Sequence, residues 1–185
     1  ENTARPRQTG LSVRAAVRIQ ITERNGKMAI LNIIKDGDPT LRKTSREVKE
    51  ITPRILTLLD DMTETLHEAN GCGLAAVQVG VLRRVVLVET DETGLLEFIN
   101  PVIVEREGEQ EELEGCLSIP GKWGYTHRPM KVTVRALDRN GNEFTVTGEG
   151  LCARAFCHEI DHLDGTLFTD NAVRMLSPEE IEEIE

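Results

Sequence analysis

The chain has 185 residues, of which 39% are hydrophobic and 29% are charged, and its formal net charge is −10. This length and composition predict one compact domain and exclude collagen-like and largely disordered proteins. The longest apolar runs are only a few residues long, far short of the ~20 residues that a transmembrane helix needs, so no membrane partner is expected.

The aromatic content and the cysteine content narrow the class further. Aromatic residues make up 3% of an acidic chain, whereas binding of single-stranded nucleic acid relies on aromatic rings set among basic side chains. We therefore expect no DNA partner. Four cysteines are too few for a disulfide-stapled scaffold, which favours a reducing, cytoplasmic location.

Residues 1–27 differ in charge from the rest of the chain. They carry six Lys or Arg and two Glu, whereas residues 28–185 carry 16 basic and 30 acidic residues. We expect residues 1–27 to be a leader or an extension added for expression, outside the fold, and residues 28–185 to form a single domain that starts at Met28. An Arg-rich leader also fits a transit peptide, so an organellar location stays open.

Hydrophobic periodicity predicts two helices separated by strands. Thr52 and Pro53 begin an amphipathic helix over 53–69. Strand-like runs follow at 83–89, 95–100 and 102–107, and a hairpin is expected over 131–149, with Asn140-Gly141 at its turn. A second helical pattern covers 151–163, and the tail from Ser177 is expected to begin a helix that frays.

The second helical segment contains the pattern His158-Glu159-Ile160-Asp161-His162. On a helix this spacing puts both imidazoles on one face about one turn apart, with Glu159 beside them. Two imidazoles can bind a divalent metal while a glutamate takes a proton from a water on that metal. The alternative is a solvated helix with two unrelated histidines.

A third metal ligand is not evident downstream of His162, because that part of the chain has no histidine and its Glu residues lie in the last seven positions. Cys116, in the segment EGCLSIP, is the obvious alternative, since glycine before it and proline after it predict a sharply shaped loop. A buried, unreactive cysteine is the competing interpretation. We apply that interpretation to the other three cysteines: Cys72, Cys152 and Cys157.

The segment GCGLAAVQVG, residues 71–80, combines small residues with one long polar side chain, Gln78. Its glycines could admit a substrate strand, although a helix end followed by a packed turn explains them as well. No Gly-Lys-Ser/Thr sequence follows, which excludes a phosphate-binding loop of that type.

Together the segments GCGLAAVQ, EGCLSIP and HEIDH, in this order, resemble the three signature motifs of the peptide deformylase family. The resemblance covers about Met28 to Asp170. It implies a metal-dependent hydrolase that removes the formyl group from the N-terminal formylmethionine of new polypeptides and releases formate. It also implies an α+β fold in which antiparallel strands pack around a central HExxH helix, with an N-terminal amphipathic helix.

The resemblance further implies a role for each matching residue. Cys116, His158 and His162 would bind the metal, and Glu159 would be the general base and acid as metal-bound water attacks the formyl carbon. The Gln78 amide and the backbone N–H of Leu117 would stabilise the oxyanion. The substrate would contact Gly73 and, along one helical stripe that continues to the histidines, Leu151 and Ala155; core packing is the alternative for these last two.

The resemblance also implies Fe²⁺ as the usual cofactor, with Zn, Ni or Co as substitutes on the same ligands. The expected partners are formyl-methionyl N-termini of nascent peptides and, transiently, the ribosome. Two other functions stay open: an HExxH metallopeptidase, and an inactive protein that only binds formylated peptides.

Two positions near the cysteine motif bear on the transfer from the family. Many bacterial members have an arginine seven residues after the cysteine, where this chain has Trp123, so the resemblance assigns no substrate contact at this position. Arg128 matches a recurrent arginine and is expected to pair with Glu114, with a solvated side chain as the alternative.

Overall fold

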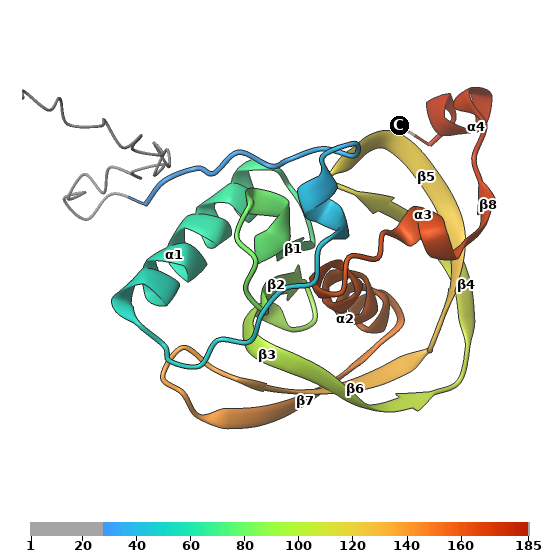
Figure 1. Ribbon diagram of the computed structural model, residues 1–185. Helices are drawn as coiled ribbons and strands as arrows, with labels where there is room; N and C mark the ends of the chain where they lie inside the picture. Colours follow the sequence, from blue (N-terminus) through green and yellow to red (C-terminus); the bar gives the residue numbers. More distant parts are fainter. Residues whose placement is uncertain (1–27, 185) are drawn as a thin grey trace, which may run out of the picture.

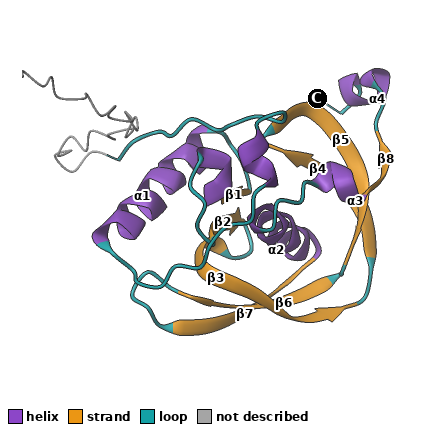
Figure 2. Ribbon diagram, viewed as in Figure 1, coloured by secondary structure: helices purple, strands orange, loops and turns teal. Residues whose placement is uncertain are grey.

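The computed structural model describes residues 28–184, so the expected extension over residues 1–27 lies outside the described residues. The described chain forms two antiparallel sheets combined with helices (Figures 1 and 2). This confirms the predicted combination of helices and antiparallel strands. The sequence did not indicate that the strands divide between two sheets.

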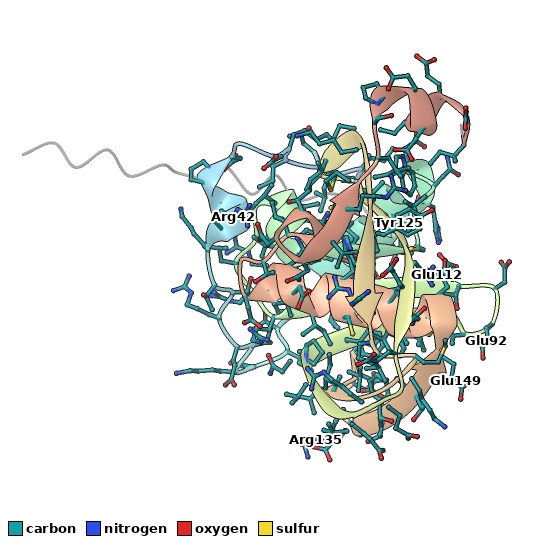
Figure 3. All side chains as sticks on the ribbon, turned by 90° about the vertical axis from the view of Figure 1, so that its right-hand side faces the viewer. Arg42, Glu92, Glu112, Tyr125, Arg135 and Glu149 are labelled. Carbon is teal, nitrogen blue, oxygen red and sulfur yellow. The ribbon has the colours of Figure 1, made fainter. Side chains whose placement is uncertain are left out.

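The larger sheet has the strand order β1-β2-β3-β6-β7. Its strands are β1 (Gly73–Ala75), β2 (Val85–Thr90), β3 (Gly94–Glu107), β6 (Lys131–Leu137) and β7 (Glu143–Glu149). The smaller sheet, of order β4-β5-β8, consists of β4 (Gln110–Cys116), β5 (Ile119–Arg128) and β8 (Ala172–Met175). Figure 3 views the molecule from the side of this smaller sheet.

The main helices are α1 (Pro53–Glu68) and α2 (Gly150–Leu163). Short helical segments complete the described chain: η1 (Pro39–Arg42), η2 (Ala76–Val79), α3 (Phe168–Asn171) and α4 (Pro178–Glu182). Among the helices of residues 28–184, none has the length and apolar composition needed to cross a membrane.

Strand β2 separates two hydrophobic cores because its side chains alternate between the two faces of the sheet. Val86 and Val88 pack in the core that contains α2 residues, and Val85 and Leu87 pack in the core that contains α1 residues. The strand is therefore apolar on both faces, as its continuous Val-Val-Leu-Val sequence requires.

Helix α1 buries one apolar stripe against the larger sheet. The stripe follows helical spacing and consists of Ile55, Leu59, Met62 and Leu66. Two main-chain N–H groups of the preceding segment bind polar side chains of α1: that of Ala29 donates to Asp61 Oδ1 at 2.6 Å and that of Leu31 to Thr65 Oγ1 at 2.8 Å. These bonds fix residues 29–31 along the helix.

Helix α2 contacts strands of both sheets and is enclosed by them in Figure 1. It begins directly after β7, at Gly150, whose φ of +53° is one that residues with a side chain rarely adopt. Ten of its fourteen residues are buried, including the polar residues His158, Glu159 and His162. Polar groups at this depth have to find partners within the protein.

Two strand predictions need correction. Residues 95–100 and 102–107 form one long strand, β3, because a β-bulge between Ile99 and Val102 absorbs Pro101 without ending the pairing with β6. The expected loop around Cys116 is a hairpin instead. Cys116 ends β4 and pairs with Ile119, which begins β5, so only Leu117 and Ser118 form the turn.

The hairpin predicted over 131–149 is confirmed: β6 and β7 pair from Lys131 opposite Glu149 to Leu137 opposite Glu143. Gly141 has a φ of +82° in its turn. The C-terminal helix α4 is short, as expected for this tail, and Ser177 Oγ caps it by accepting a hydrogen bond from the N–H of Glu180 at 3.3 Å.

Candidate active site

A cavity of about 460 Å³ lies where three separate segments of the chain meet. Residues 70–73 with Gln78, residues 113–117 with Trp123, and the side of α2 from Leu151 to Glu159 line it. The segments are those that contain the three sequence motifs. Except for His162, which is buried beside it, every predicted site residue lines this cavity: Gly73, Gln78, Cys116, Leu117, Leu151, Ala155, His158 and Glu159.

Cys116, His158 and His162 form a compact cluster of metal-ligating atoms. One ligand atom of each lies within 4.8 Å of the other two, and Cys116 Sγ is 3.3 Å from His162 Nε2. Tetrahedral bonds of about 2.3 Å to sulfur and about 2.0 Å to nitrogen separate the ligand atoms by roughly 3.3 to 3.6 Å. The three side chains therefore fit a first-row divalent ion.

The surroundings shift the pKa values of the two histidines in opposite directions. Burial lowers the pKa of His162 well below its usual value, which keeps its imidazole neutral and able to bind a metal. Burial acts in the same direction on His158, but hydrogen bonds with Cys116 and Glu114 outweigh it and raise the pKa of His158. The negative groups around His158 thus favour a positive charge on or next to its imidazole.

The buried carboxylate of Glu114 binds the imidazole of His158. His158 Nδ1 donates to Glu114 Oε2 at 2.9 Å, which leaves Nε2 as its ligand atom. Arg128 Nε donates to the other oxygen of Glu114 at 2.7 Å, and Arg128 Nη1 donates to Asp161 at 2.7 Å. Burial opposes ionisation of Glu114, yet the bonds from His158 and Arg128 lower its pKa to about 2. The predicted pairing of Arg128 with Glu114 is confirmed.

Glu159 lies against Gly73 of β1. A Cβ atom at position 73 would be 2.7 Å from both Cγ and Cδ of Glu159 and closer still to Oε1. The Oε2 atom of Glu159 is buried without a hydrogen-bond partner among residues 28–184. Burial raises the pKa of Glu159 to about 7. A carboxyl group with such a pKa can exchange protons near neutral pH.

Gln78 is fixed from both ends of its amide. Its Oε1 accepts from the N–H of Ala75 at 2.8 Å, and its Nε2 donates to Ser118 Oγ at 3.1 Å and lies 3.6 Å from Cys116 Sγ. The amide N–H groups therefore face Cys116 of the candidate metal cluster. The side chain is only 1% exposed, so it is rigidly held.

The segment from Ile34 to Asp36, here called the clamp, connects Gln78 with the β4–β5 turn. The N–H of Ile34 donates to the carbonyl of Gln78 and that of Asp36 to the carbonyl of Ser118, both at 2.8 Å. Lys35 Nζ donates to the carbonyl of Leu117 at 2.7 Å. Two backbone N–H groups and one lysine side chain of the clamp thus connect Gln78 with the turn that contains Leu117 and Ser118.

The remaining wall of the cavity is largely apolar. Leu151 is 52% exposed and lines the cavity with Ala155, so core packing does not explain Leu151. Trp123 also lines it and lies beside Gly115, where a Cβ atom would be 2.7 Å from the indole ring. Trp123 thus forms part of the cavity wall next to β4, the strand that ends at Cys116.

Two of the three remaining cysteines follow the prediction. Cys152 and Cys157 are buried and free, and burial raises the pKa of each thiol. The prediction of a buried Cys72 is wrong: this thiol is exposed and lines the cavity. The cause is local, because β1 begins at Gly73 and leaves Cys72 at the rim.

Four further residues support the site without having been predicted: Lys35, Gln110, Ser118 and Arg154. Ser118 is completely buried next to Gln78, and Arg154 lines the cavity while bonded to Gln110. Ser118 stands within the cysteine motif, which could have indicated its role. Arg154 stands four residues before His158, a helical spacing that could have indicated its place at the cavity. Lys35 and Gln110 carry no spacing or pattern that points to the cavity.

Comparisons with known proteins match the sequence and the fold of this chain. The family model described as polypeptide deformylase matches residues 30–177. The peptide deformylase of Acetivibrio thermocellus is 57% identical over 155 residues, covering 84% of this chain and 91% of the relative. Two solved structures each cover 84% of this chain. The peptide deformylase of Legionella pneumophila has a TM-score of 0.75 at 43% identity over 90% of that chain. That of Ehrlichia chaffeensis in complex with actinonin has 0.76 at 39% identity over 94%.

Proposed function

The chain belongs to the polypeptide deformylase family, and from this premise we propose a role for each side chain of the cavity. The chain is a peptide deformylase: it hydrolyses the formyl group from formyl-methionyl peptides and releases formate. One observation carries the assignment of roles, namely that all three sequence motifs line or adjoin one cavity. The two other functions, a metallopeptidase and an inactive binder, are not supported by the family match.

The family is metal-dependent, and we propose that Cys116, His158 and His162 hold the ion. One thiolate with two neutral imidazoles suits several first-row ions, of which we propose Fe²⁺, with Zn, Ni or Co as substitutes. When bound, such an ion supplies a Lewis acid that polarises the formyl oxygen and lowers the pKa of a water. Metal analysis of the protein purified without added metal identifies the ion.

Glu159 moves the proton in the proposed reaction. Its unpartnered Oε2 and its pKa of about 7 suit a group that first accepts a proton from the attacking water and then donates it to the departing amine nitrogen. The oxygen of water bonds to the formyl carbon, the carbon–nitrogen bond breaks, and the products are formate and a free N-terminus. The same residue therefore acts as base and as acid.

Gln78 and Leu117 stabilise the negative charge that develops on the formyl oxygen. The amide of Gln78 already points its N–H groups toward Cys116, and the clamp fixes its position relative to the turn that contains Leu117. Donors that are held before the reaction stabilise the transition state without reorganising. The N–H of Leu117 supplies the second donor in this proposal.

The substrate occupies the cavity with its methionine side chain against Leu151 and Ala155, and its backbone passes Gly73, whose lack of a side chain lets Glu159 lie directly against β1. Partly apolar walls suit a thioether side chain. We also propose that the protein acts in the cytoplasm and meets its nascent substrates at the ribosome in transient contacts. The acidic helix α4 does not favour docking on RNA through that end.

A single substitution tests the proton-transfer role. Glu159→Gln keeps the shape of the side chain but removes the carboxylate that accepts a proton, so hydrolysis of formyl-Met-Ala-Ser should fall by about 10²–10⁴-fold. The metal content, measured in the same preparations, should stay unchanged. Cys116→Ala is the matched comparison, because it should reduce metal retention itself. A Glu159→Gln enzyme with nearly full activity would show that another group is the base.

A further inference from the structure

Gln110, the first residue of β4, is a buried amide with all of its close partners defined. Its Nε2 donates to the carbonyl of Pro129 at 2.8 Å and to that of Gly150 at 3.0 Å. Its Oε1 accepts from Arg154 Nη1 at 2.8 Å. The side chain thus joins the start of α2 to the connection between β5 and β6.

The chemistry of these partners fixes the orientation of the amide. Both carbonyl oxygens can only accept hydrogen bonds, whereas a guanidinium can only donate. The NH₂ group must therefore face Pro129 and Gly150, and the oxygen must face Arg154. Exchanging the two ends of the amide would break all three bonds at once.

Arg154 lies one helical turn before His158 on α2 and lines the same cavity. Its positive charge reaches the Cys72 thiol, which also lines the cavity and whose pKa it lowers against the larger, opposite effect of burial. Arg154 is the only Lys or Arg among the residues that line this cavity in the described chain. A mobile cation here would compete with an uncharged substrate side chain.

We propose that Gln110 is a positioning residue that holds the guanidinium of Arg154 at the cavity wall and thereby keeps the cavity open for the uncharged side chain of the formylated residue. This inference rests on the proposed function of the cavity. It assigns a specificity role to a pair of residues, one on β4 and one on α2, that neither contact the reacting atoms nor belong to the three motifs.

The energetic reason lies in the flexibility of arginine. A long side chain released from its acceptor samples many rotamers, and some of these place the guanidinium inside the cavity. The apparent affinity for substrate then equals the intrinsic affinity multiplied by the fraction of molecules whose cavity is open. Loss of the Gln110 acceptor should therefore raise KM for formyl-methionyl peptides, while kcat, which depends on the metal cluster and Glu159, changes little.

Two substitutions at position 110 separate this role from a general structural one. Gln110→Met keeps the length of the side chain but removes the acceptor for Arg154, and should raise KM for formyl-Met-Ala-Ser about tenfold, the usual effect of a lost hydrogen bond to a charged group. Gln110→Glu loses the same two donated bonds yet keeps an acceptor, so its KM should stay within about twofold of the wild-type value. Gln110→Ala replaces the methionine variant if that does not fold.

A double substitution completes the test. In an Arg154→Met background, Gln110→Met should change KM by less than about twofold, because no guanidinium is left to release. In the single variant, the preference for formyl-Met-Ala-Ser over formyl-Glu-Ala-Ser should decrease, since a freed guanidinium can bind an acidic side chain.

The proposal is overturned if Gln110→Met keeps the wild-type KM, if Gln110→Glu raises KM as much as Gln110→Met does, or if the tenfold rise persists in the Arg154→Met background. Each of these outcomes would mean that Gln110 only supports the fold. Failure of the proposed function is distinguishable, because the wild-type enzyme itself would then not hydrolyse formyl-Met-Ala-Ser.

Discussion

Gly73 has no room for even a methyl group on the side that faces Glu159. A Cβ atom there would meet three atoms of the Glu159 side chain at 2.7 Å or less, and helix α2 cannot retreat because it is packed between two sheets. Gly73→Ala should therefore displace the Glu159 carboxyl. Since a shift of about 1 Å in a reacting group can cost about 10²-fold in rate, we expect a loss of that size in kcat, with metal content unchanged.

Gly148→Ala provides the comparison for this prediction. A Cβ atom at position 148 would also be crowded, at 2.5 Å from Cys152 Sγ and 2.9 Å from Phe156, but these neighbours are core residues away from the cavity. This substitution should lower the melting temperature and leave kcat per folded molecule unchanged. If Gly73→Ala shows the same pattern, the contact between Gly73 and Glu159 has only a packing role.

We expect Glu114 to affect how firmly His158 holds the proposed metal ion. Its carboxylate accepts from His158 Nδ1 and from Arg128, and these bonds keep it ionised in spite of its burial. Glu114→Gln removes the charge behind the imidazole and leaves the side chain nearly the same size. Loss of such a supporting group typically weakens metal binding about 10–100-fold, which competition with a chelator measures.

The neighbouring exposed residue Glu112, labelled in Figure 3, supplies the control. Glu112→Gln removes the same charge from the same strand without touching His158, so metal affinity should not change. Equal affinities for the two variants would show that Glu114 does not act on the metal ligands through His158.

The clustering of Cys116, His158 and His162 was predictable because the histidines have a spacing with a chemical meaning and Cys116 stands in a segment that resembles a family motif. The pairing of Gln110 with Arg154 was not, because neither stands in a recognised motif and the two residues, separated by 44 positions, meet only in the folded chain. Cys72 was assigned wrongly for a related reason. Its exposure depends on where β1 begins, which the composition of residues 71–80 does not indicate.

The clamp links the N-terminal part of the described chain to Gln78 and to the β4–β5 turn, which carry the two proposed oxyanion donors. It binds the carbonyls of Gln78, Leu117 and Ser118. Lys35→Met removes the only side-chain bond of this set and keeps the aliphatic stem. A net hydrogen bond of about 1 kcal/mol corresponds to roughly fivefold in rate, so we expect kcat to fall by about that factor at unchanged KM.

Two further variants serve as controls for the kcat of Lys35→Met. Lys35→Arg retains a donor and should restore most of kcat. Lys43→Met removes an exposed lysine whose side chain makes no hydrogen bond to any residue in the range 28–184. A decrease of equal size in Lys35→Met and Lys43→Met would contradict a specific role of the clamp and indicate a general effect of charge.

Elements with a clear hydrophobic period agreed with expectation, and those without one did not. The stripe on α1 and the alternation along the β6–β7 hairpin result directly from burial of one face. Strands β4 and β5 have several exposed charged positions and a turn, Leu117-Ser118, without glycine or asparagine. Their pairing depends on contacts with α2, α3 and β8, which local sequence does not encode.

At the scale of the whole molecule, the site is where the two sheets and α2 meet. Cys116 comes from the smaller sheet, Gly73 from the edge strand of the larger one, and the histidines from the helix between them. These groups are brought together by the arrangement of both sheets around α2. The proposed metal ligands, Cys116 and His162 among them, are therefore far apart in sequence.

This arrangement predicts which part of the N-terminus is dispensable. The family match begins at residue 30, and all proposed site residues lie between Gly73 and His162. A chain that starts at Met28 should therefore retain the kcat/KM and the melting temperature of the full chain. We accordingly propose that residues 28–185 are the catalytic domain and that residues 1–27 are not part of it.

A slightly deeper truncation gives the matched comparison. A chain that starts at Asn32 lacks the two N–H groups that bind Asp61 and Thr65 of α1 and the Leu31 side chain that packs against the core beside α1. Two lost hydrogen bonds and one lost apolar contact should cost about 2–4 kcal/mol in the free energy of unfolding. Denaturant titration of the three chains measures this difference. If removal of residues 1–27 alone causes a loss of that size, the first 27 residues belong to the folded domain.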